Sequence, residues 1–161
     1  MPTATADKPP LRVQPATGRA IWVSEPPARW QVRQPLVVDC SVVVAWLFEE
    51  PEGQEAVQTL SGRALHAPTL LPYEVANVAR SKRRAGAPAE SVVRVLEDFQ
   101  AQSLDIGWHK PPAPAVLALA ERYNLSSYDA AYLWVAAELK APLAPLDRRL
   151  ADAARQLLSD L

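Results

Sequence analysis

Four carboxylates stand where an α/β protein gathers its polar site residues. Asp39 and Asp147 each follow a short apolar segment that reads as a β-strand. Glu74 and Asp129 lie in the first turns of two predicted helices. The carboxyl ends of parallel strands and the starts of the following helices meet at one edge of a sheet. We therefore expect the four side chains to converge at that edge.

Carboxylates brought this close repel one another, and without a cation some of them would take up protons. Mg²⁺ or Mn²⁺ removes the repulsion, because both ions prefer oxygen ligands. A bound ion also lowers the pKa of a coordinated water and offsets charge on a phosphate, which is the chemistry of phosphodiester hydrolysis. We predict Asp39 and Asp129 as the primary ligands, with Glu74 and Asp147 completing the shell or orienting water.

Each acid also has a purely structural interpretation. Asp39 could accept hydrogen bonds from the first amides of the next helix. Asp147 could act as the N-cap of the last helix. Ser126 and Asp129 have the spacing of a capping box, and Glu74 favours the dipole of its helix. The metal site is favoured because all four acids fall at the same predicted edge.

The elements that must position these acids alternate along the chain. Strands are expected at 36–39, 63–68, 104–108 and 142–146, and they alternate with helices. The first helix is expected to be capped by Ser41. Alternating strands and helices predict an α/β fold, a three-layer α/β/α sandwich around a central, mainly parallel sheet.

Composition limits the class of protein. The 161 residues suffice for one domain with a real core, and the net charge of −1 argues against a surface that coats nucleic acid broadly. One cysteine forms no internal disulfide, and no apolar run is long enough to span a membrane, so we expect a cytoplasmic protein. Residues 1–35 are rich in proline and predict an arm that is partly disordered or docked, whereas 36–161 form the domain.

Other side chains near the acids suit RNA binding. Arg80 and Arg83 end the Glu74 helix and Arg148 follows Asp147, where they are candidates for phosphate contacts, although basic residues also compensate a helix dipole. Tyr128, Tyr132 and Trp134 follow as base-stacking candidates, although aromatic residues on a helix more often belong to the core or a dimer contact. His66 and His109 are interpreted as structural.

Four segments resemble the acidic motifs of PIN domains, in particular those of VapC-type toxins: Val37–Val42, Leu71–Val78, Leu125–Leu133 and Pro145–Leu150. The resemblance covers the chain from about Pro35 onward. It implies a Mg²⁺- or Mn²⁺-dependent endoribonuclease with a PIN-like, Rossmann-like sandwich. It also implies an RNA substrate, a homodimer and a cognate antitoxin protein.

Carried over by position, the resemblance makes Asp39, Glu74, Asp129 and Asp147 the metal-binding, catalytic acids. It makes Ser41, Asn77 and Ser126 supporting polar residues. The fourth motif differs from the family, because Pro145 occupies a position where Thr is common. The alternative is a PIN-like interaction module, with weak or no catalysis, that binds a partner protein.

Overall fold

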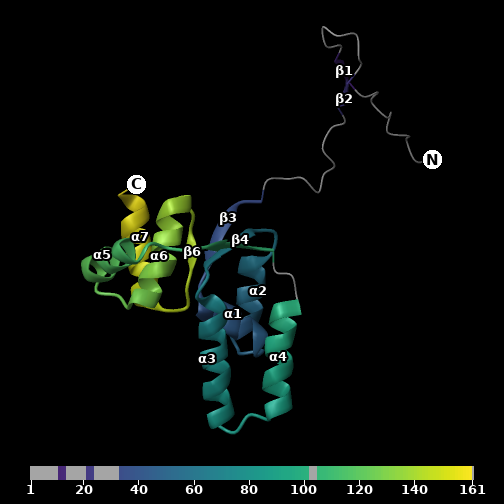
Figure 1. Ribbon diagram of the computed structural model, residues 1–161, viewed down its shortest axis with the longest axis vertical. Helices are drawn as coiled ribbons and strands as arrows, with labels where there is room; N and C mark the ends of the chain where they lie inside the picture. Colours follow the sequence, from purple (N-terminus) through teal and green to yellow (C-terminus); the bar gives the residue numbers. More distant parts are fainter. Residues whose placement is uncertain (1–10, 14–20, 24–32, 102–104, 161) are drawn as a thin grey trace, which may run out of the picture. The chain divides into compact units, whose positions relative to one another are not determined.

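The computed structural model describes residues 11–13, 21–23, 33–101 and 105–160, and the chain divides into two units at residues 32 and 33. In the first unit, β1 (Leu11–Val13) pairs antiparallel with β2 (Ile21–Val23) (Figure 1). Most of the predicted proline-rich arm lies outside the described residues, so its docking or disorder stays a prediction.

The second unit is built on a four-stranded sheet whose described pairings are all parallel. Its order is β5 (Ile106–His109), β4 (Ala64–Pro68), β3 (Pro35–Val38) and β6 (Leu143–Ala144). Val37 lies opposite both His66 and Leu143, so the strand that precedes Asp39 is central. Burial from both faces explains why this strand is apolar throughout.

Two groups of helices flank the sheet (Figure 1). One group contains α1 (Cys40–Leu47), α2 (Gly53–Leu60), α3 (Leu71–Arg84) and α4 (Ala89–Ala101). The other contains α5 (Ala113–Tyr123), α6 (Ser127–Leu139) and α7 (Arg148–Ser159). This arrangement confirms the predicted α/β sandwich. Among the described residues, no helix is both long and apolar enough to cross a membrane.

Helix α6 is the central element of its layer. It packs against β3 and β4 on one side and contacts α5 and α7 on others. Ala130, Ala131 and Ala136 are buried together with larger neighbours. Small side chains let a helix approach several partners closely, which explains why this segment is rich in alanine. The packing fixes the start of α6, where Asp129 lies.

The helix ends follow local backbone chemistry. Asn124 ends α5 in the left-handed conformation with φ 51°, as its side chain allows. The expectation that Ser41 caps the first helix is wrong, because Asp39 is the N-cap and α1 begins at Cys40. Asp39 has extended backbone angles, and its carboxylate reaches the amide of Ser41, so the cap forms two residues earlier.

Candidate active site

Asp39 is a buried carboxylate at the carboxyl end of the central strand β3, with 7% of its surface exposed. Its Oδ2 accepts hydrogen bonds from the Ser41 amide at 3.0 Å and from the Ser41 hydroxyl at 2.5 Å. Burial raises the pKa of Asp39, and the charge of Asp129 raises it further, while the bonds from Ser41 lower it. A charge held in this position favours a cation beside it.

Ser41 connects two parts of the site that are far apart in sequence. Its hydroxyl donates to Asp39 and also accepts a hydrogen bond from the amide of Leu146 at 3.1 Å. Leu146 directly precedes Asp147, in the segment between β6 and α7. The start of α1 is therefore joined to the segment that carries the fourth acid.

Glu74 lies in the first turn of α3, where its Oε2 accepts a hydrogen bond of 2.5 Å from the Tyr132 hydroxyl. Burial is the main cause that raises the pKa of Glu74 to about 7. The bond from Tyr132 lowers this pKa, and the charges of Asp39 and Asp129 raise it. Tyr132 has no exposed surface and links α6 to α3 at this point.

Asp129 occupies the first turn of α6, and Ser126 is the N-cap of that helix. The Asp129 amide donates to the Ser126 hydroxyl at 3.1 Å, and this hydroxyl donates to Asp129 Oδ2 at 2.7 Å. The predicted cap is confirmed. The same contacts hold the Asp129 carboxylate at the start of the helix, near enough to Asp39 and Glu74 for its charge to raise the pKa of both.

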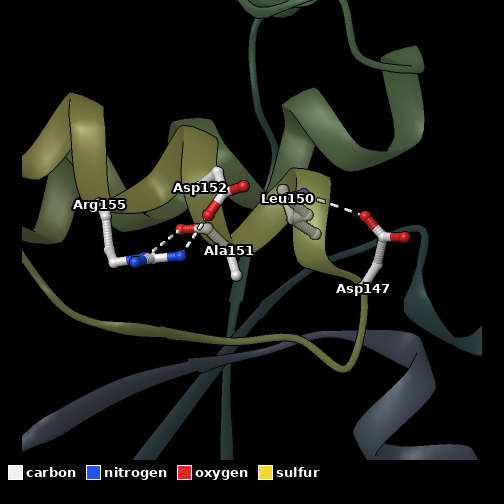
Figure 2. A network of polar contacts seen from close by, with 5 residues as sticks. All are labelled: Asp147, Leu150, Ala151, Asp152 and Arg155. Carbon is white, nitrogen blue, oxygen red and sulfur yellow. Dashed lines mark hydrogen bonds and ion pairs between the residues drawn. The ribbon is translucent and has the colours of Figure 1, made fainter.

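Asp147 is the exposed N-cap of α7 (Figure 2). Its Oδ1 accepts a hydrogen bond of 3.0 Å from the amide of Leu150, as the dashed line in Figure 2 shows. Farther along α7, Arg155 pairs with Asp152 on the exposed helix surface (Figure 2). The structural interpretation of Asp147 as an N-cap is confirmed, and its carboxylate stays open to solvent.

Asp39 and Asp129 lie near enough to Glu74 for their charges to raise its pKa, and Asp147 follows the Leu146 amide that bonds Ser41. No three His, Cys, Asp or Glu side chains of the described residues are placed to hold a metal ion as they stand. The donor set is nevertheless made of carboxylate oxygens, as hard divalent cations prefer. Within residues 33–101 and 105–160, the ion pairs do not include these acids; they are Lys82–Glu50, Arg122–Asp160 and Arg155–Asp152.

The basic residues differ in their distance from the acids. Arg80 and Arg83 follow Glu74 on α3 by six and nine residues, which is about 9 and 14 Å along a helix axis. Arg83 Nη1 donates to the Ala87 carbonyl at 2.6 Å, so this side chain also closes the end of α3. Arg148 is exposed and directly follows Asp147, which favours it for a phosphate contact.

No nucleophile is formed by the Cys40 thiol or by the pair of His66 and His109. Burial, followed by the charges of Glu74 and Asp39, raises the pKa of the Cys40 thiol to about 12, so it stays protonated. His66 Nδ1 and His109 Nε2 lie 3.1 Å apart and pair across β4 and β5. Burial and then His109 lower the pKa of His66. This pairing agrees with the structural interpretation of both histidines.

Sequence reasoning did not predict the roles of two tyrosines of the site. Tyr132 was interpreted as a base-stacking candidate or, more often for a helix, a core residue; its burial confirms the core interpretation, and its hydroxyl binds Glu74. Its position three residues after Asp129, on the same helix face, was the available signal. Tyr73 precedes Glu74 and is exposed; together with Tyr128 and Asn77 it lines a pocket beside Glu74.

Comparisons with known proteins agree with this arrangement. Residues 36–156 match the PIN domain family. Ribonuclease VapC3 of Pyrobaculum aerophilum is 31% identical over 122 residues, which cover 73% of this chain and 92% of that protein. The crystal structure of PAE2754 from Pyrobaculum aerophilum has a TM-score of 0.59 at 22% identity, covering 83% of this chain and 94% of that one, and supports the fold. The chain therefore belongs to the PIN domain family and is similar to its VapC-type members.

Proposed function

We propose that this protein is an endoribonuclease that hydrolyses RNA phosphodiester bonds with the help of Mg²⁺ or Mn²⁺. One observation carries the proposal: at the edge of a parallel sheet the charges of Asp39 and Asp129 raise the pKa of Glu74, the charge of Asp129 raises that of Asp39, and no described ion pair neutralises these acids. The similarity to ribonuclease VapC3 supports RNA as the substrate.

In this proposal Asp39 and Asp129 hold the cation, while Glu74 and Asp147 complete the shell or orient water. The bound ion supplies an acidified water and offsets negative charge on the phosphate. The chain itself supplies the orientation of the acids. Ser41 fixes the Asp39 carboxylate through two hydrogen bonds to Oδ2.

Two further contacts hold the other acids. The Tyr132 hydroxyl donates a hydrogen bond to Oε2 of Glu74, and the Ser126 hydroxyl donates one to Oδ2 of Asp129. Both contacts come from α6 and its N-cap, so this one helix helps to orient two of the carboxylates. Arg148, next to Asp147, is proposed to contact a phosphate of the RNA, with Arg80 and Arg83 binding the strand farther away.

The VapC-type similarity also guides the proposed setting of the activity. We infer that the protein is the toxin of a toxin-antitoxin pair, acts in the cytoplasm as a homodimer, and is silenced by a cognate antitoxin protein. Asn77 is proposed as a supporting residue, as its place after Glu74 on α3 suggests. Residues 1–35 are proposed as an arm outside the nuclease domain.

The test is cleavage of a mixed set of RNAs by the pure full-length protein in Mg²⁺ or Mn²⁺. Asp39→Asn is the sharpest variant, because asparagine also caps helices and so leaves α1 intact. We expect its cleavage rate to fall at least about a hundredfold, as after loss of a metal ligand. A chelator is expected to abolish cleavage.

The matched control is Glu138→Gln, which removes an exposed carboxylate near the other end of α6. It is expected to cut as the wild type does. Cleavage that persists in chelator and in Asp39→Asn would refute the metal-dependent site. A protein that neither cuts RNA nor binds either metal would instead fit the interaction module that binds a partner protein.

A further inference from the structure

A pocket of about 400 Å³ adjoins Glu74 at the starts of α3 and α6. Tyr73 comes from α3 and Tyr128 from α6, and 78% and 62% of their surfaces are exposed. Two large aromatic side chains that are exposed at the same pocket indicate a binding surface, because aromatic residues are enriched where ligands bind.

The rest of the pocket wall is mixed in character. Leu70 and Val78 supply apolar surface, and the exposed Asn77 supplies an amide that both donates and accepts hydrogen bonds. This combination suits a flat, aromatic ligand with a polar edge.

Charge decides which part of a nucleotide the pocket accepts. Glu74 lines it directly, and Asp39 and Asp129 are close enough to raise the pKa of that carboxyl. A phosphate entering here without a bound cation would meet like charge. A nucleobase is neutral, its faces stack on tyrosine rings, and its edge bonds an amide such as that of asparagine.

We propose that Tyr73 and Tyr128 bind one unpaired nucleobase of the RNA next to the phosphate that is cut, with Asn77 reading the edge of that base. This inference rests on the proposed function, because the neighbouring acids define where cutting takes place. It requires the base to leave any stack or pair with its neighbours, so the preferred substrate is single-stranded.

The first experiment compares Tyr73→Ala and Tyr128→Ala with the corresponding Phe variants on a single-stranded RNA that the wild type cuts. Each Ala variant is expected to lower kcat/KM by about fivefold to a hundredfold, through KM, because a stacking surface is lost. Each Phe variant keeps the ring and is expected to stay within about twofold of the wild type. Trp108→Ala is the matched control, because Trp108 is 48% exposed on β5 and does not line the pocket.

The second experiment separates this inference from the proposed function. Asp39→Asn protein is mixed in chelator with a fluorescent single-stranded RNA, and binding is followed by anisotropy. A second substitution in this protein, Tyr73→Ala or Tyr128→Ala, is expected to weaken RNA binding by the same factor as it raises KM in the first experiment. This result is expected even if the protein cuts no RNA. An abasic nucleotide at the bound position should weaken the binding of the tyrosine-containing protein but not that of the Ala variants.

Three results would overturn the inference: Ala variants that bind and cut as well as the wild type, Phe variants as damaged as the Ala variants, or an equal loss in Trp108→Ala. Failure of the proposed function has a different signature. In that case no variant cuts RNA in any metal, whereas the binding comparison still gives its own answer.

Discussion

Replacing Glu74 by glutamine is expected to stabilise the metal-free protein at alkaline pH. The pKa of Glu74 lies at about 7 in the folded protein, against an ordinary value of 4.5. This pKa shift means that ionising Glu74 costs about 3 kcal/mol more in the folded protein than in the unfolded chain, because one pKa unit is worth about 1.4 kcal/mol. Since the side chain is only partly buried, solvent screening reduces the expected effect to about 2 kcal/mol.

The direction follows from which state holds the proton. Between pH 4.5 and about 7 the folded protein keeps a proton on Glu74 that the unfolded chain has released, so the free energy of unfolding falls as pH rises. Above that window, Glu74 is charged in both states, and the folded protein bears the full free-energy cost of holding this charge in a partly buried position. Glutamine carries no charge, and its amide oxygen still accepts the bond from Tyr132.

The assay is urea denaturation in chelator, at pH 5 and at pH 8, of wild type, Glu74→Gln and the surface control Glu138→Gln. We expect Glu74→Gln to exceed the wild type by about 2 kcal/mol at pH 8 and by much less at pH 5. Glu138→Gln should follow the wild type at both values. A wild type that is as stable as Glu74→Gln at pH 8, or a gain of equal size at pH 5, would refute the electrostatic reasoning.

Three other variants or conditions test the contacts around the acids. Tyr132→Phe removes the donor to Glu74 and is expected to cost about 1–2 kcal/mol in urea denaturation, and to lower RNA cleavage in the same preparation. Ser41→Ala loses the hydroxyl's bonds to Asp39 and Leu146 but keeps the amide bond to Asp39, and it should lower the free energy of unfolding by about 1–2 kcal/mol; unchanged stability would contradict the bridging role of the hydroxyl. Millimolar Mg²⁺ or Mn²⁺ should raise the Tm of the wild type by several degrees at pH 8 and that of Asp39→Asn much less, as scanning calorimetry can show.

Much of the fold could be predicted because its signals are local. Short apolar runs, helical periodicity and residues such as Asn124 at helix ends depend on neighbours in the sequence. The caps formed by Ser126 and Asp147 belong to the same class, since each cap bonds an amide three residues ahead. The first helix was misjudged because Asp39 and Ser41 are both good N-caps, and the extended backbone of Asp39 decides between them.

The details of the site could not be predicted, because they depend on packing between distant segments. The bond between Tyr132 and Glu74 joins residues 58 positions apart and requires α6 to lie against α3. The pocket lined by Tyr73 and Tyr128 has the same origin, since its walls come from α1, α3 and α6. Sequence spacing indicates which edge of the sheet carries the acids, but not which oxygen each neighbour binds.

The hydrogen bond between Ser41 and Leu146 has a consequence for synthesis of the chain. Ser41 emerges from a ribosome 105 residues before Leu146, and α7 follows Leu146. Domains fold as units during or after synthesis, so a growing chain holds the first acids long before their closing contact exists. A growing chain that ends before Leu146 therefore lacks the hydrogen bond that joins the start of α1 to the segment of the fourth acid.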